Sequence, residues 1–199
     1  MSREHRSSAL GELLAIAASV LDATGPAPAA TVTCLPHERF LPAITLTPAS
    51  LWMSVEEQFA LPRLVAERMG WPLQPLSTAD GYASTGTLEG VRVQALAAPL
   101  PSTSRTPLAR GKVTTAEHAD PLRALVDWAA SLPTAVTGLE VREDLDGAGQ
   151  LTARLIVPRG FDVSPLNEVI MPVPADDWSG LRGAGILPTG HALTISEGR

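Results

Sequence analysis

Residues 77–96, STADGYASTGTLEGVRVQAL, contain the clearest structural signal in the chain. The glycine spacing of residues 81–87 is that of a phosphate-binding loop, but Thr87 stands where such a loop needs a lysine. A phosphate loop must also lead into a helix, whereas from Val91 onward apolar and polar residues alternate, as in a half-buried strand. The intervening Glu-Gly pair suits a tight turn. The stretch therefore predicts a β-hairpin over 82–96 and not a phosphate site.

The residues at the start of the chain predict a helix followed by two short strands. Apolar residues three and four positions apart indicate an amphipathic helix that begins near Ser7 or Ser8 and fades before the Gly-Pro segment. The β-branched run at 31–35 predicts a strand, with Val32 and Cys34 on its buried face. Residues 40–47 predict a second strand, which Pro42 places at an edge or a bulge.

A second helix is expected just before the hairpin. Ser54 and Glu57 form the pattern of a capping box at its start, and Gly70 is a suitable C-terminal stop. Pro62 lies inside this helical pattern and lacks the amide N–H that the helix needs there. We therefore expect a kink or two short helices.

The second half of the chain opens in a similar way. Asp120 is expected to cap a helix with Pro121 at its first position, followed by an apolar stripe that Trp128 flanks. Strands are expected at 136–144 and 151–157, joined by an Asp-Gly turn, with a short helix at Ser164 and a final hairpin at the C-terminus. A duplication and a shared α+β logic both account for the likeness of the halves.

These patterns predict an α+β protein made of two small units, residues 1–96 and 120–199. Each unit is expected to pack helices on an antiparallel sheet, because apolar and polar residues alternate in its strands. Residues 97–119 are rich in Pro, Ser and Thr and carry a small excess of positive charge. They are expected to form a linker or a long surface loop.

Composition excludes several classes of function. The net charge of −6 argues against a surface devoted to nucleic acid, which needs clustered lysine and arginine. The single cysteine, Cys34, rules out an intrachain disulfide and a multi-cysteine zinc site. No stretch approaches the ~20 apolar residues of a membrane span. The N-terminal segment does not read as a targeting signal, so we expect a cytoplasmic protein that does not bind membranes.

The residues that could carry chemistry are few. Cys34 and His37 are close enough in sequence to form a nucleophile and its base, although a thiol that ends an apolar strand is usually a buried hydrophobe. Arg105 and Arg110 are the candidate ligand-binding residues. No histidine or carboxylate pattern predicts a metal site, and no motif predicts a cofactor.

Tryptophans are the remaining candidates for binding. Trp52 and Trp71 bracket the second helix and are the candidate interface residues, with core or rim packing as the simpler interpretation.

The segments ERMGW (67–71) and GYASTGTLEGVRV (81–93) resemble small uncharacterised α+β orphan proteins encoded by actinobacterial genomes and mobile elements. The resemblance covers residues 1–96. It implies an α+β fold and assigns no activity, cofactor or site residues.

Because every catalytic template fails, we expect a non-enzymatic binding or regulatory accessory protein that acts through protein–protein contacts. Its partner would be another protein or a second copy of the chain. The alternative is a small-molecule-binding protein or enzyme with a pocket between the two halves, where ligand sites often lie.

Overall fold

The structure is a computed structural model in which the described residues are 8–36, 41–49, 53–77, 80–98, 115–143, 151–166, 170–172, 181–187 and 190–198. Its helices are α1 (Ser8–Thr24), α2 (Val55–Met69), α3 (Thr115–Ala124) and α4 (Val126–Ala130), with a 3-10 turn η1 (Ser164–Leu166). Its strands are β1 (Ala30–Leu35), β2 (Ala43–Pro48), β3 (Leu73–Pro75), β4 (Tyr82–Leu88), β5 (Val91–Ala97), β6 (Gly138–Glu143), β7 (Leu151–Val157), β8 (Ile170–Pro172), β9 (Leu181–Ile186) and β10 (Ala192–Glu197).

The ten strands of the described residues belong to one sheet, in the order β3-β4-β5-β2-β1-β6-β7-β10-β9-β8. The expected α+β class is confirmed, but the expectation of purely antiparallel sheets is wrong, because β2–β5 and β7–β10 are parallel pairs. In each case the connection between the two strands runs through a helix or turn and a strand pair, which gives the chain room to return in the same direction. The antiparallel pair β1–β6 joins the halves into this single sheet, so each half does not have a sheet of its own.

The two halves repeat one arrangement of strands. Outward from the centre, the first half runs β1-β2-β5-β4-β3 and the second runs β6-β7-β10-β9-β8, which is the same order in each half. Gly86 on β4 pairs with Val93 on β5, and Gly185 on β9 lies opposite Leu193 on β10. Since β1 and β6 are antiparallel, an approximate two-fold axis between these strands relates the two halves.

The hairpin predicted over 82–96 is present as β4 and β5. Its turn residues Glu89 and Gly90 both have positive φ, 52° and 78°, which is the backbone conformation of a tight turn that matches the twist of the strands. Gly190, before β10, also has a positive φ of 83°.

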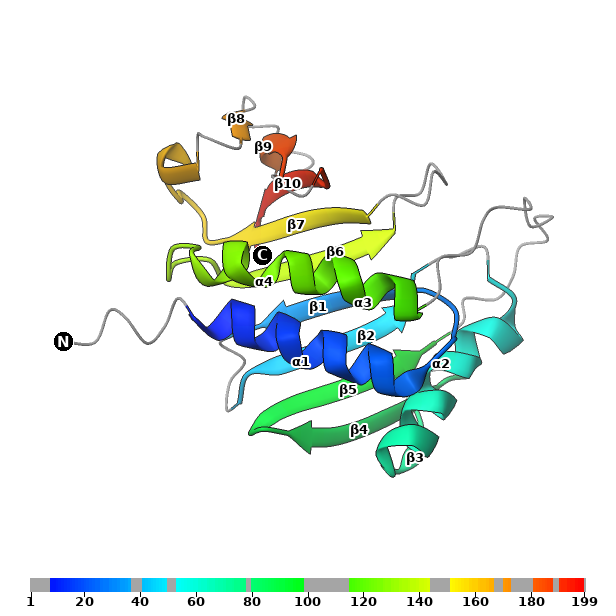
Figure 1. The fold of residues 1–199 in the computed structure, drawn as a ribbon. Helices are drawn as coiled ribbons and strands as arrows, with labels where there is room; N and C mark the ends of the chain where they lie inside the picture. The colour runs from blue at the N-terminus through cyan, green and yellow to red at the C-terminus, as the bar shows by residue number, and fades with distance from the viewer. Residues whose placement is uncertain are drawn as a thin grey trace.

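The helices cover one face of the sheet. Figure 1 shows α1, α3 and α4 lying across it on the viewer's side. α2 packs on the same face, because Trp71 beyond its end lies against Gly86 and Phe59 makes an edge-to-face contact with Tyr82. Gly11 of α1 lets this helix pack closely on α4: a side chain there would meet the backbone oxygen of Val126.

One hydrophobic cluster runs through both halves beneath these helices. It includes Leu14 of α1, Leu122 of α3 and Val93 of β5, all without solvent exposure. The expected flanking position of Trp128 is confirmed, since it is partly buried against this cluster. A core continuous across the β1–β6 pair means that the halves share their hydrophobic stabilisation.

The ends of α2 form as expected, and the helix is continuous between them. Ser54 Oγ accepts a hydrogen bond from Glu57 N at 3.2 Å and Glu57 Oε2 accepts one from Ser54 N at 2.9 Å, which completes the capping box. Gly70 ends the helix in the left-handed conformation. Of the two alternatives expected at Pro62, a kink or two short helices, the second does not occur, because α2 continues through this buried proline. Pro62 is buried together with Leu61 and Val65, and this packing offsets the backbone hydrogen bond that proline cannot form.

Three further expectations differ from the structure: the place of β2 in the sheet, the start of α3 and the length of the linker. β2 lies between β1 and β5 and not at an edge, since Pro42 precedes the first paired residue and removes no hydrogen bond from the ladder. The expected roles of Asp120 as cap and Pro121 as first helical residue are wrong, because α3 already begins at Thr115. The expected linker is shorter at both ends, as β5 extends to Ala97 and the start of α3 lies inside it.

Candidate functional site

The sheet face opposite the helices is polar along its centre, while Leu35, Leu96 and Ile156 lie on the same face nearer the ends of the strands. Because side chains alternate along a strand, burial of Val32 and Cys34 under the helices directs Thr33 to the other face. On β2, Leu46 is buried in the same way, and Thr45 shares the face with Thr33, with which it pairs. None of the four described helices packs on this side, which we call the open face.

One row of paired residues crosses the open face over eight strands. From β4 to β9 the cross-strand row consists of Thr85, Gln94, Thr45, Thr33, Glu140, Arg154, Thr194 and Ala184. All eight side chains are half-buried or exposed. All of them except Ala184 can form hydrogen bonds. With about 4.8 Å between neighbouring strands, the row is about 34 Å long. The row therefore presents polar groups at the regular spacing of the sheet.

Charge on the open face concentrates just beyond its centre, on the second half. Glu140 pairs in register with Arg154 on β7, and its carboxylate lies 3.9 Å from Arg142 Nε, two residues along β6. Arg154 Nε donates a hydrogen bond to Ser196 Oγ at 3.1 Å. The Arg142 side chain is 43% exposed and the Glu140 side chain 20%. The Arg142 guanidinium thus lies near the Glu140 carboxylate in a position that solvent reaches, and Arg154 adds a second positive charge on the neighbouring strand.

Cys34 lies on the helix side of β1 and is fully buried, so the expected burial of this thiol is confirmed. Burial raises the pKa of the Cys34 thiol to about 12, because the apolar surroundings disfavour the thiolate. A thiol of this kind is a poor nucleophile at neutral pH. Its neighbours Val32 and Leu139 are also fully buried, which makes Cys34 part of the core.

The structure places only one of the other candidates. Trp71 is half-buried, and its indole ring lies against Gly86, where a side chain would collide with the ring. This position fits the simpler interpretation of Trp71 as a packing residue. His37, Trp52, Arg105 and Arg110 lie outside the described residues.

Sequence reasoning missed the open face, although its signal is present. The pattern Thr-x-Thr occurs at 31–33, 45–47 and 85–87, each time in a strand. Each pattern alone indicates only a strand with one polar side. The row appears only when registers are known, since Thr33 meets Glu140 through a pairing between residues more than a hundred positions apart.

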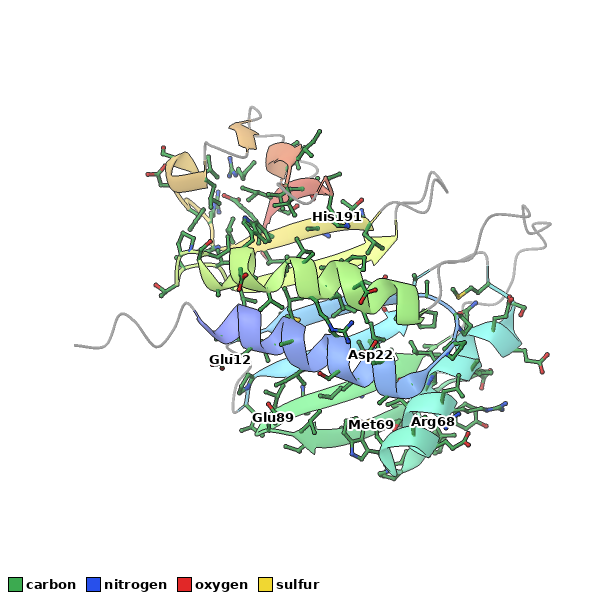
Figure 2. All side chains as sticks on the ribbon, in the orientation of Figure 1. Glu12, Asp22, Arg68, Met69, Glu89 and His191 are labelled. Atoms are coloured by element: carbon green, nitrogen blue, oxygen red, sulfur yellow. The ribbon has the colours of Figure 1, made fainter. Side chains whose placement is uncertain are left out.

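His191 is the described histidine whose environment changes its acidity. It follows Gly190 and is half-buried instead of fully solvated, and this partial burial lowers the pKa of its imidazole. Figure 2 shows it at the start of β10.

In the described segments, no three His, Cys, Asp or Glu side chains come together in a group that could hold a metal ion.

None of the described helices combines the length and apolar composition that a membrane crossing requires. Comparisons of the chain with protein-family models, with curated proteins and with solved structures gave no match.

Proposed function

We propose that this protein is a non-enzymatic binding protein that holds a protein partner on the open face of its sheet. The observation that carries the proposal is the cross-strand row, in which seven neighbouring side chains from Thr85 to Thr194 are polar and which the described helices leave uncovered.

The size of the open face supports this proposal. Strands of six residues are about 20 Å long, and a row of about 34 Å across them outlines an area of roughly 700 Å². Standard protein–protein interfaces bury about 800 Å² on each partner. The open face therefore has about the area that one partner contributes to a stable complex.

The composition of the face supports a polar interface. Threonine and glutamine side chains supply both donors and acceptors, and short hydroxyl side chains lose little conformational entropy when a partner covers them. The β1–β6 pair holds the centre of the row on interior strands, so the site is presented by a rigid element.

The alternative, a small-molecule site between the halves, has less support among the described residues. At that junction Val32 and Cys34 of β1 meet Leu139 and Val141 of β6, and none of the four is more than 1% exposed. Apolar packing occupies the place where such a pocket would lie. A thermal-shift screen against metabolites tests this alternative directly.

Site-specific photo-crosslinking tests the proposed function. A photoreactive amino acid replaces Thr33 at the centre of the open face, and in a matched protein it replaces Glu12, which is exposed on α1 on the helix side (Figure 2). After irradiation in the native host, we expect a discrete adduct from position 33, identified by mass spectrometry, and none from position 12. Equal adducts from both positions, or none from position 33, would refute the proposal.

A further inference from the structure

We propose that the partner held by the open face presents an acidic segment, whose carboxylates contact Arg142 and Arg154. This inference rests on the proposed function and adds the chemistry of the partner. It is carried by the charge of the open face, which differs in sign from that of the whole chain.

The charges of the open face can be counted from the registers. Among the described strand residues of this face, Arg92 on β5, Arg142 on β6 and Arg154 on β7 are positive and Glu140 is negative, which gives these residues a net charge of +2. The whole chain has a net charge of −6. The face is thus a positive region on an acidic protein, and its field attracts acidic partners.

The same count disfavours a second copy of the chain as the occupant. Two open faces brought together in a symmetric dimer would each carry a net charge of +2 and would repel each other. An acidic segment instead meets partly exposed guanidinium groups, and guanidinium groups form paired hydrogen bonds with carboxylates. The polar row then supplies partners for the backbone and side chains of that segment.

Glu140 has a specific part in this arrangement. In the protein without a partner, its carboxylate lies near Arg142, and it sits opposite Arg154 in the register of β6 and β7, so its negative charge offsets part of the positive charge there. An incoming carboxylate competes with Glu140 for these arginines. Removal of the Glu140 charge should therefore strengthen binding of an acidic segment, whereas removal of an arginine charge should weaken it.

Fluorescence anisotropy with a defined probe tests these opposite effects. The probe is a fluorescein-labelled peptide of alternating Glu and Gly, and the comparison peptide alternates Lys and Gly. We expect the full-length protein to bind the acidic peptide, and Arg142→Gln to weaken binding by about threefold to fivefold, the size of a partly exposed ion pair. Arg63→Gln, which removes an exposed arginine from α2, is the matched control and should change the affinity by less than half as much.

Glu140→Gln is the second variant and should tighten binding about threefold, with Glu12→Gln as its control of equal charge. Thermal melting of each variant confirms that it is folded. Equal effects of the open-face variants and their controls, or tighter binding of the basic peptide, would overturn the proposal. Self-association in light scattering that Arg142→Gln strengthens would also overturn it, in favour of a second copy. A crosslink from position 33 together with no binding of the acidic peptide would retain the proposed function and reject this inference.

Discussion

Labelling by a thiol reagent measures how deeply the Cys34 sulfur is buried on β1, at the centre of the sheet. The signal comes from this residue alone, because the chain has no other cysteine. The pKa of this thiol is about 12 in the folded protein, against 9.0 for the unperturbed group. At about pH 8 the thiolate fraction is then about one tenth in the unfolded chain and about one ten-thousandth in the folded protein. Since the thiolate is the reactive form, we expect native labelling to be at least about a thousandfold slower than labelling in denaturant.

The assay follows release of a chromophore from a disulfide reagent, with and without urea, at matched pH. Steric protection by the core adds to the effect of pKa, so the thousandfold ratio is a lower bound. Native labelling within about tenfold of the unfolded rate would refute the burial argument. Such a result would show an accessible thiolate and would restore Cys34 and His37 as a candidate catalytic pair.

The same pKa predicts how stability depends on pH. Above about pH 9 the unfolded chain loses the Cys34 proton while the folded protein keeps it until about pH 12, so stability falls as pH rises through this range. At about pH 10 this lowers the free energy of unfolding by about 1.4 kcal/mol. Cys34→Ala should cost about 1 kcal/mol at neutral pH, as small core truncations do, and should remove this part of the pH dependence. Urea unfolding of both proteins at several pH values measures this difference. If the free energy of unfolding fell equally with pH in both proteins, the prediction would be wrong.

Three further substitutions test packing and capping, each by urea unfolding. Gly86→Ala should destabilise the protein by about 2–3 kcal/mol, because its new methyl group would collide with the Trp71 ring. Gly70→Ala should cost only about 1 kcal/mol, since its φ of 66° is strained for alanine but the surrounding space is open; a cost equal to that of Gly86→Ala would contradict the clash. Ser54→Ala should cost about 1 kcal/mol through loss of the capping box, and an unchanged midpoint would show that the cap contributes nothing.

Local elements of the fold could be predicted from sequence because they depend on neighbouring residues. The turn at Gly90, the capping box at Ser54 and the alternation around Cys34 each involve residues within a few positions, and all three are confirmed. The direction of β5 relative to β2 could not be predicted, since alternation is the same in parallel and antiparallel strands.

The candidate site was hidden for a related reason. Thr33 and Glu140 are separated by a whole half of the chain, and only the β1–β6 register brings them together. Local rules for proline were also incomplete: Pro62 lies inside a continuous α2, and Pro121 lies inside α3 and not at its start. For the buried Pro62, a local rule about a missing N–H does not count the core packing that compensates for it.

The approximate two-fold axis between β1 and β6 has a consequence for recognition. Two identical chains paired at this axis would place matching residues on both sides, and a bound segment could lie across them in either of two opposite directions with equal energy. In a single chain the two sides can differ. Here Thr45 on β2 and Arg154 on β7 occupy equivalent positions on opposite sides of the axis, and one is neutral while the other is charged. The covalent link between the halves thus gives a symmetric scaffold a polarity, so that the two opposite directions of a segment bound there, as proposed, would differ in energy.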